Sequence, residues 1–421
     1  MCGANIALVY NIIVEKAHIH FIGIGGSGMS ALAAILHKQG HTVSGSDQQR
    51  SATTDHLKKI GVKIFIGHYA HNIPKQTQYV VHSLAIPKSN PELREARRRK
   101  VETYAYPQTV GHLSRFYYTI AICGTHGKTT TTAMVAKILI ENGFDPTVIV
   151  GSKLDFLDGQ NYRVGKSKFL VLEACEYQKA FLNYFPNAIV VLNIEPDHFD
   201  AFKNEREYHK VFDDFIARLP DDGILIQPQK PSALPFKLKV PGKHNMANAA
   251  AAMKVCETLG VPRTKIKKSL QSFQGSARRF EIKGKIGRTI VIDDFAHHPT
   301  EIRATLQAAR EKYPKKKICV IFQPHQYSRT KALLKEFGPA FKGAALVVIP
   351  NIYEARDTAK DKRSVSSGAL VQELKKNKIN AIDGKGMEPT LAYVKTHHKN
   401  CDLIITMGAG DVSSIAQKLI G

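Results

Sequence analysis

Tryptophan is absent from the sequence, and cysteine is sparse and scattered. The six cysteines occupy positions 2, 123, 175, 256, 319 and 401, with no CxxC pair and no metal-ligand spacing. Disulfide-rich secreted domains and zinc modules place their cysteines at short, regular spacings. The pattern disfavours both classes and predicts separate structural thiols in a reducing, cytoplasmic compartment.

Long apolar runs are lacking as well. Beyond the opening residues, no stretch approaches the roughly 18 apolar residues that a membrane-spanning helix needs. The apolar opening from Ala4 to Val14 is neither preceded by basic residues nor followed by a small-residue cleavage pattern, so a signal peptide is not expected. We therefore predict a protein without stable membrane insertion.

Acidic residues are in short supply. With 60 Lys and Arg against 36 Asp and Glu, the formal net charge is +24, and such a field attracts nucleotides, nucleic acid and anionic lipid alike. The densest basic runs, Arg97 to Lys100 and Lys315 to Lys317, carry no interleaved aromatic residues, which favours a solvated basic face. A nucleic-acid-binding ATPase is the weaker alternative, and we expect no nucleic-acid partner.

The order of apolar runs indicates an α/β fold with three domains. A strand from His18, a helix from Met29 and a strand ending at Asp47 give β-α-β order. The same order restarts at Tyr118 and again after Gly275. We expect an N-terminal Rossmann-like domain at 1–112, a central P-loop ATPase-type α/β domain at 113–275 and a C-terminal Rossmann-like domain at 276–421, with hinges near residues 112 and 275.

A glycine-containing loop between a strand and a helix is the strongest local signal. Its residues are Gly124, Thr125, His126, Gly127, Lys128, Thr129 and Thr130. In a phosphate loop, backbone N–H groups at the helix start hold phosphate oxygens, the lysine adds positive charge and the next hydroxyl can bind magnesium. The strict spacing would place glycine where this sequence has Ile122. The combination still favours an ATP site over an ordinary turn.

Acidic residues follow the next two strands. Glu173 ends one apolar strand, with Glu176 close behind, and the run from Asn193 to His198 ends the next. Such residues can simply solvate strand ends, but Mg²⁺ prefers hard oxygen ligands. The carboxyl ends of parallel strands also share one edge of a sheet. Two acidic strand ends after one phosphate loop therefore favour a metal site.

An earlier loop matches the dinucleotide-binding pattern GxGxxG. It contains Gly23, Gly25, Gly26, Gly28 and Ser30. Asp47 follows at the distance of a ribose-binding acid. Taken alone, the motif is typical of an NAD(P)-dependent oxidoreductase or of a tight turn required by packing. A hydride-transfer enzyme has no use for a second loop of the triphosphate type, so we expect this loop to hold the diphosphate of another nucleotide.

Three loops end strands of the third domain. They are Asp293 to Pro299, Gln323 to Thr330 and Gly408 to Asp411. The first contains His297 and His298 beside two acids, and it could bind a zwitterion or a metal, or merely cap a helix. Arg329 in the second is suited to holding a carboxylate. Three such loops on one domain edge suggest a site.

The ordered motifs resemble those of the Mur ligase family of peptidoglycan synthesis. From His18 to the C-terminus they read GIGGSGMS, SGSD, AIPKSNPE, GTHGKTTTT, NIEPDHFD, GKHNMANAAAA, ARRFE, DDFAHHPTE and GAGD. The resemblance implies a UDP-sugar-binding domain, a central ATPase and a C-terminal domain that delivers an amino acid. It implies ATP and Mg²⁺ as cofactors, with UDP-N-acetylmuramate and a small amino acid as substrates. We expect a monomer or a homodimer.

The resemblance also assigns the partners of ATP. Lys128 would neutralise the transferred phosphoryl group, and Arg279 would reach the phosphates. The adenine side would be formed by His244, Asn245 and Asn248. In the expected reaction the sugar-acid carboxylate attacks the γ-phosphate, and an amine then captures the acyl phosphate.

A magnesium set and an amino-acid site follow from the same resemblance. The magnesium ligands would be Thr129, Glu173 and His198. The residues facing the incoming amino acid would be His297, His298 and Arg329. Together with Lys128 and His198, these three complete the expected catalytic set.

Two positions depart from the pattern of the alanine-adding members of the family, which have a tyrosine and an arginine where this sequence has Phe295 and Gln326. Loss of one cationic group weakens the expectation of L-alanine without touching the ligase chemistry. The phenylalanine also occurs in the recycling ligase that adds a whole tripeptide, which is the alternative. The run FQPHQYSRT favours the ligase that adds a single residue.

Overall fold

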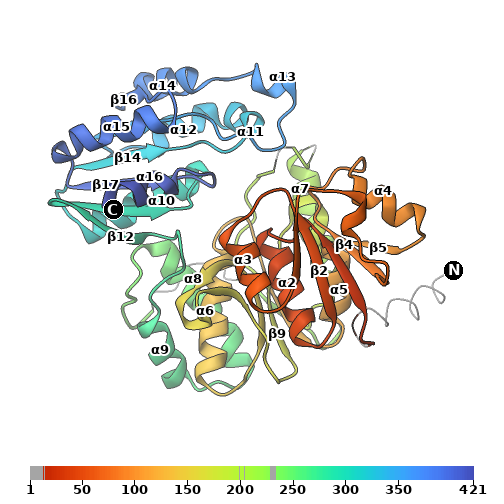
Figure 1. The fold of residues 1–421 in the computed structure, drawn as a ribbon. Helices are drawn as coiled ribbons and strands as arrows, with labels where there is room; N and C mark the ends of the chain where they lie inside the picture. Colours follow the sequence, from red (N-terminus) through yellow and green to blue (C-terminus); the bar gives the residue numbers. More distant parts are fainter. Residues whose placement is uncertain (1–12, 14, 199, 203, 228–233) are drawn as a thin grey trace.

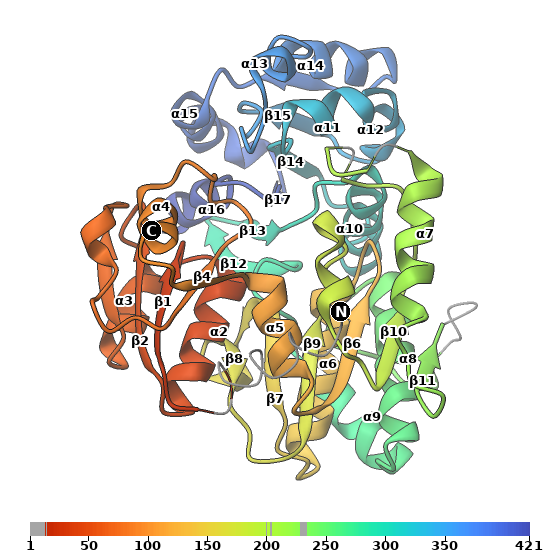
Figure 2. The ribbon, with the colours of Figure 1, turned by 90° about the vertical axis from the view of Figure 1, so that its right-hand side faces the viewer.

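The computed structural model describes residues 13, 15–198, 200–202, 204–227 and 234–421. Most of the apolar opening considered as a signal peptide therefore lies outside the described residues. The described part of the chain forms three α/β units, each built on its own sheet. In Figures 1 and 2 the C-terminal unit lies above the N-terminal and central units. The predicted α/β class with three domains is confirmed.

The N-terminal unit has a five-stranded, fully parallel sheet of order β3-β2-β1-β4-β5. Its elements are β1 (His18–Ile22), α2 (Ser27–Lys38), β2 (Thr42–Asp47), α3 (Ala52–Lys59), β3 (Lys63–Ile66), η1 (Ala70–Asn72), β4 (Tyr79–His82), α4 (Pro91–Arg98), β5 (Glu102–Ala105) and α5 (Tyr106–Ser114). The strand order reverses between β1 and β4, and ligands of such sheets bind at the carboxyl ends of the strands at this reversal.

The central unit has a six-stranded sheet of order β11-β10-β6-β9-β7-β8, in which β8 pairs antiparallel with β7. Its elements are β6 (Tyr118–Cys123), α6 (Lys128–Glu141), β7 (Thr147–Leu154), η2 (Asp155–Leu157), β8 (Gln160–Arg163), β9 (Phe169–Glu173), η3 (Tyr177–Asn183), β10 (Ala188–Val191), α7 (Glu205–Ile216), β11 (Ile224–Ile226), α8 (Lys243–Thr258) and α9 (Arg263–Ser272). The central strand β6 runs directly into the glycine loop and α6.

The C-terminal unit has a six-stranded sheet of order β12-β13-β17-β14-β15-β16, in which β12 is the antiparallel edge. Its elements are β12 (Glu281–Ile286), β13 (Thr289–Asp294), α10 (Pro299–Lys312), β14 (Ile318–Phe322), α11 (Tyr327–Ala332), α12 (Leu334–Ala340), β15 (Leu346–Ile349), α13 (Ala359–Lys362), α14 (Ser367–Lys376), β16 (Ala381–Asp383), α15 (Met387–His397), η4 (His398–Asn400), β17 (Leu403–Met407) and α16 (Ser413–Ile420).

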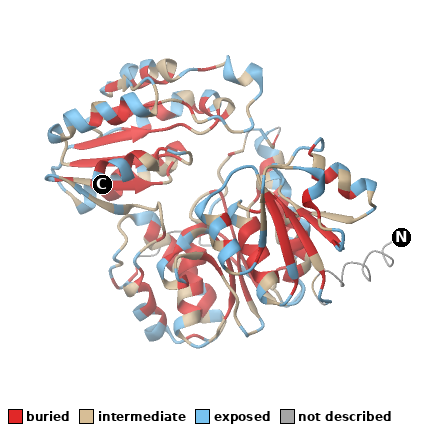
Figure 3. Cartoon of the chain, in the orientation of Figure 1, coloured by how far each residue is buried: buried red, intermediate tan, exposed pale blue. Residues whose placement is uncertain are grey.

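Burial explains why the apolar runs become central strands. On β6 the side chains alternate between two cores, with Ile120 and Ile122 on one face and Ala121 and Cys123 on the other. The core that holds Ala121 also contains α2 and α5 residues of the N-terminal unit. The C-terminal unit has separate cores, and Figure 3 shows buried strands in each unit.

The two expected hinges have different surroundings. Residue 112 lies within α5, whose Gly111 packs so closely on η3 that a Cβ would come 2.2 Å from the carbonyl oxygen of Asn183. Residue 275 lies in the loop between α9 and β12. A shared apolar core restrains motion between two units, whereas separate cores permit it.

One pair of cysteines corrects the expectation of separate thiols. Cys319 on β14 and Cys401 just before β17 form a disulfide, while Cys123, Cys175 and Cys256 remain thiols. The two residues are 82 positions apart in sequence, so their spacing carries no signal of pairing. Since β14 and β17 are parallel neighbours, the fold brings the two Cα atoms to 5.9 Å, a usual disulfide separation.

We predict that breaking this disulfide lowers the stability of the C-terminal unit. Closure of a loop of this length is worth roughly 4 kcal/mol on a chain-entropy model, so a chemical reductant should lower the melting temperature measured by scanning calorimetry. Cys319→Ser should melt at the reduced protein's temperature and be insensitive to the reductant. Mass spectrometry of the alkylated wild type would contradict the prediction if it found Cys319 and Cys401 as free thiols before reduction.

No described helix combines the length and the apolar character needed to cross a membrane.

Candidate active site

The glycine loop has the backbone of a phosphate-binding loop. Gly124 and Gly127 have φ of +129° and +84°, a region that favours glycine. A Cβ on Gly127 would lie 2.4 Å from Oδ1 of Asn248 on α8, so glycine is also required by close packing. The loop ends at Lys128, the first residue of α6, and its N–H groups lie at the positive end of that helix dipole.

Lys128 is held by a buried carboxylate. Its Nζ donates to Oε2 of Glu176 at 2.9 Å and to the carbonyl oxygens of Gly124 and Thr125. Burial is the largest single influence and lowers the pKa of Lys128, but the charge and hydrogen bond of Glu176, together with Cys175 and Glu173, outweigh it and the net pKa is raised. For Glu176, burial raises the pKa, but Lys128 and His198 together lower it to about 2. Both groups are therefore charged at neutral pH.

Two of the three expected magnesium ligands are in direct contact. The Thr129 hydroxyl donates to Oε1 of Glu173 at 2.9 Å, and Oε2 of Glu173 accepts the Gly151 N–H at 2.6 Å. A hydroxyl beside a carboxylate is a hard-oxygen set of the kind that Mg²⁺ binds, so these residues fit the ion. The third, His198, instead lies with Nε2 3.4 Å from Oε1 of Glu176.

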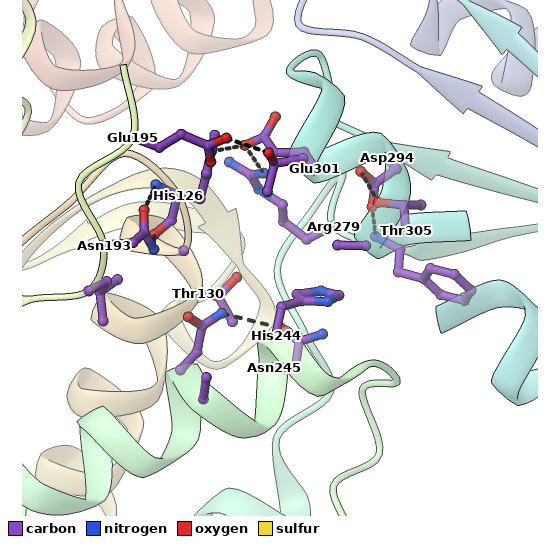
Figure 4. Close-up of a pocket in the computed structure, with 17 residues that line it drawn as sticks. His126, Thr130, Asn193, Glu195, His244, Asn245, Arg279, Asp294, Glu301 and Thr305 are labelled. Carbon is purple, nitrogen blue, oxygen red and sulfur yellow. Dashed lines mark hydrogen bonds and ion pairs between the residues drawn. The ribbon is translucent and has the colours of Figure 1, made fainter. Parts of the chain in front are cut away.

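A cavity of about 350 Å³ lies between the glycine loop, α8 and the C-terminal unit. Its walls include His126, Gly127, Thr130, Asn193, Glu195, His244, Asn245, Asn248, Arg279, Phe280, Asp294, Thr300, Glu301 and Thr305. Figure 4 shows His244 and Asn245 on the α8 side and Arg279 across from His126. The structure thus brings together the loop and the residues expected on the adenine and phosphate sides, at a volume typical of ligand cavities.

An ion-pair network closes the cavity between the central and C-terminal units. Nε2 of His126 lies 3.0 Å from Glu195, and Nδ1 lies 3.2 Å from Glu301 on α10. Thr300 donates to Oε1 of Glu195 at 2.6 Å. Burial lowers the pKa of His126, but the two carboxylates raise it to about 9. The pKa of Glu195 is lowered to about 2, chiefly by its hydrogen bond with His126.

The two histidines just before Pro299 of α10 lie beside this ion-pair network, but neither lines the cavity. His298 is buried and caps the helix, with Nδ1 accepting from the Thr300 N–H at 3.3 Å. Its Nε2 has no hydrogen-bond partner among the described residues, and burial lowers its pKa to about 4. His297 lies 3.1 Å from Glu301, and burial lowers its pKa as well. Both imidazoles are neutral at neutral pH.

Arg329 and Gln326 have partners that the sequence did not reveal. Arg329 is buried and forms an ion pair with Asp197 of the central unit, so its charge is already balanced across the interface. Gln326 is buried, and its amide donates to the carbonyl oxygen of Ala355 at 2.9 Å. Phe295 lies 5.0 Å from the Arg279 guanidinium, a cation-π contact.

The N-terminal loop lines a second, larger cavity of about 880 Å³. Gly23, Gly25, Gly26 and Asp47 lie in its wall, and Oδ2 of Asp47 accepts the Gly25 N–H at 2.8 Å. Two expected residues serve packing instead. A Cβ on Gly28 would lie 2.5 Å from the Tyr106 ring, and the buried Ser30 hydroxyl donates to the carbonyl oxygen of Ser27.

A buried polar cluster behind this cavity was not predicted. Glu92 of α4, which is fully buried, lies 2.7 Å from Nε2 of His20 and 2.7 Å from Nδ1 of His68. Ser46 donates to the same carboxylate at 2.8 Å. His68 reaches the cavity wall. Because these residues are separated by long stretches of sequence, only a motif shared by relatives could have signalled the cluster.

One chain of contacts joins the two loops. The Ser27 hydroxyl at the start of α2 donates to the Gly151 carbonyl oxygen at 3.1 Å. The N–H of the same Gly151 donates to Glu173, which accepts from Thr129 beside Lys128. On the other side of the phosphate loop, Glu301 of α10 forms an ion pair with His126 of the loop. All three units therefore meet at the phosphate loop.

This fold and site define a member of the Mur ligases, and the chain belongs to that family. Three family models match successive parts of it: the Mur ligase catalytic domain at residues 18–118, the Mur ligase middle domain at 122–233 and the Mur ligase glutamate ligase domain at 278–410. The models follow the order of the three sheets.

Relatives that align over nearly the whole chain carry a more specific name. The UDP-N-acetylmuramate–L-alanine ligases of Clostridium novyi and Clostridium acetobutylicum are 39% and 40% identical, over 96% of this chain and 97% of each relative. The structure of the UDP-N-acetylmuramate-alanine ligase MurC from Thermotoga maritima matches with a TM-score of 0.79 at 28% identity, covering 96% of this chain and 98% of that one. A murein peptide ligase from Psychrobacter arcticus has the same fold at 22% identity and a TM-score of 0.69, over 96% of this chain and 98% of that one.

The raised pKa of His126 predicts a pH-dependent interface. Its stabilising charge is present below the ordinary value of 6.5 and is lost as pH rises through about 9. The melting temperature, measured by scanning fluorimetry without nucleotide, should therefore fall between pH 6.5 and 9. His298, whose pKa is lowered to about 4, titrates near 6.5 only in the unfolded state, so its opposite contribution is complete by about pH 8 and the fall between pH 8 and 9 is left to His126. His126→Gln should flatten the slope, and an unchanged slope in that variant would rule out His126 as its source.

Proposed function

We propose that the chain is an ATP-dependent ligase that joins the carboxylate of UDP-N-acetylmuramate to the amine of L-alanine in peptidoglycan synthesis. The observation that carries the proposal is the meeting of all three units at the phosphate loop, through Ser27 and Gly151 on one side and His126 and Glu301 on the other. A carboxylate is a poor electrophile, so amide formation needs an activating group. A site that borders two nucleotide-sized cavities can supply one.

The proposed reaction has two steps. The sugar-acid carboxylate oxygen attacks the γ-phosphorus of ATP, the bond to the β-phosphate oxygen breaks, and ADP leaves. The neutral amine then adds to the carbonyl carbon of the acyl phosphate, the nitrogen releases one proton to solvent, and inorganic phosphate departs with the electron pair of its C–O bond. Lys128 offsets the charge that gathers on the transferred oxygens.

The central unit and the start of the C-terminal unit supply the remaining proposed contacts to ATP. His244, Asn245 and Asn248 form the adenine side, and Arg279 reaches the phosphates across the cavity. Thr129 and Glu173 would hold Mg²⁺, with His198 on the side of Glu176. The ion supplies additional positive charge at the phosphate oxygens when bound.

We further propose domain limits at 112/113 and 275/276 and a cytoplasmic location.

L-Alanine is preferred over a tripeptide because the aligned relatives at 39–40% identity are named as L-alanine ligases. The murein peptide ligase, at 22% identity, supports the fold alone. Gln326 does not argue against L-alanine, because its amide donates to the carbonyl oxygen of Ala355. Membership in a family of cell-wall ligases also leaves no role for NAD(P) at the N-terminal loop.

A substrate panel tests the proposal directly. Phosphate release with ATP, Mg²⁺ and UDP-N-acetylmuramate should be fastest with L-alanine, slower with L-serine and glycine, and slowest with the murein tripeptide. The measurement is kcat/KM for each amine. Fastest release with the tripeptide would replace the proposal by the recycling ligase, and no release with any amine would refute both.

Replacement of Lys128 tests the phosphoryl-transfer centre. Lys128→Ala should lower phosphate release by at least about 10²–10³-fold, the usual cost of losing one group that stabilises transition-state charge. Binding of UDP-N-acetylmuramate, measured by calorimetry, should stay largely intact because the N-terminal cavity is separate. Lys137→Ala on the same helix is the matched control and should keep near-wild-type turnover. Retained turnover in Lys128→Ala would exclude the assigned role.

A further inference from the structure

A free amino acid and a peptide differ next to the attacking amine. The amino acid carries an α-carboxylate there, whereas the first residue of a peptide carries an uncharged amide. A ligase that selects a single amino acid can therefore do so with a cation placed to read that carboxylate. Such a cation would have to lie near Lys128 and His198.

The prominent cations at the centre are already paired. Lys128 donates to Glu176 at 2.9 Å, and Arg329 is buried in its ion pair with Asp197. Both carboxylates have lowered pKa values, so these pairs stay charged at neutral pH. To bind a substrate carboxylate, Arg329 would have to share a buried partner, which costs free energy.

Arg356 is differently placed. It lies on the loop between β15 and α13, and its guanidinium is 4.3 Å from the centre of the Tyr177 ring of the central unit. That ring is 5.0 Å from the ring of His198. The nearest carboxylate contact of Arg356, from Nε to Asp200, is 3.9 Å, beyond hydrogen-bond distance. Its side chain is 43% exposed, so donors remain open to a ligand.

The loop that carries Arg356 is anchored on both sides of it. The Gln326 amide donates to the carbonyl oxygen of Ala355 at 2.9 Å. On the other side, Asp357 accepts the N–H groups of Tyr327 and Ser328 at 2.9 and 3.1 Å. The guanidinium is thus presented from a fixed backbone, and Figure 1 shows α13, which follows the loop, above α7 of the central unit. Gln326 contributes by positioning the loop.

We propose that Arg356 is a specificity-determining residue that binds the α-carboxylate of the incoming amino acid beside Tyr177 and His198. This inference rests on the proposed ligase function and names the group that selects a free amino acid over a peptide. A guanidinium fits a carboxylate with two parallel hydrogen bonds, and the aromatic face below it keeps the fork in place.

The test compares two amines in two proteins. Wild type and Arg356→Gln are assayed for phosphate release with L-alanine and with L-alaninamide, which lacks the carboxylate charge. For L-alanine, the substitution should raise KM by about 10- to 100-fold, the value of hydrogen bonds to a charged group, with kcat changed less than about threefold. For L-alaninamide, KM should change less than about threefold, so the preference for L-alanine should largely vanish.

Controls separate this role from a structural one. Arg363→Gln, an exposed arginine at the end of α13, removes the same charge nearby and should leave both KM values unchanged. Melting temperatures of the two variants should match the wild type. Equal losses of Arg356→Gln on both amines, or no loss on L-alanine, would overturn the inference while leaving the ligase intact. A wild type that releases no phosphate with any amine would overturn the proposed function and this inference with it.

Discussion

The buried ion pair between Lys128 and Glu176 is the interaction around which the site is built. A lone ammonium in that position would be strongly destabilised, and the pair is tolerated because each charge offsets the burial cost of the other. Glu176 is in turn held by His198 and by Tyr208, whose hydroxyl lies 3.3 Å away. The lysine side chain is therefore held in one place by protein groups alone.

The interfaces around this pair differ in kind. The N-terminal and central units share one apolar core, which holds the first glycine loop at a fixed place relative to Glu173. The C-terminal unit instead meets the centre through His126, Glu301, Arg329 and Asp197. Water can solvate both partners of such charged contacts if the units separate, whereas an apolar core would be left exposed. The N-terminal and central units are therefore joined by an apolar core, and the C-terminal unit is joined to them by polar contacts.

Local sequence patterns predicted much of the fold, because β6 is an apolar run followed by glycine and β9 is an apolar run that ends in a glutamate. They failed where structure depends on distant partners. The strand β8 has the sequence QNYR and carries no apolar alternation, and the Cys319–Cys401 pairing depends on the neighbouring placement of β14 and β17. At the site, the motifs located Thr129 near Glu173, but the partners Glu195 and Glu301 of His126 lie on elements that meet only in the folded chain.

Gln326 shows how a departure from a motif can mislead when it is considered alone. If position 326 bound a ligand directly, glutamine in place of arginine would mean the loss of a positive charge there. In the fold, its amide holds the carbonyl oxygen of Ala355, the residue just before Arg356, so the position acts on the adjacent loop instead of on a ligand. A cation removed from one loop can be replaced from another, provided the backbone of the second loop is fixed. Selectivity in this site is therefore a property of two packed loops and not of one motif.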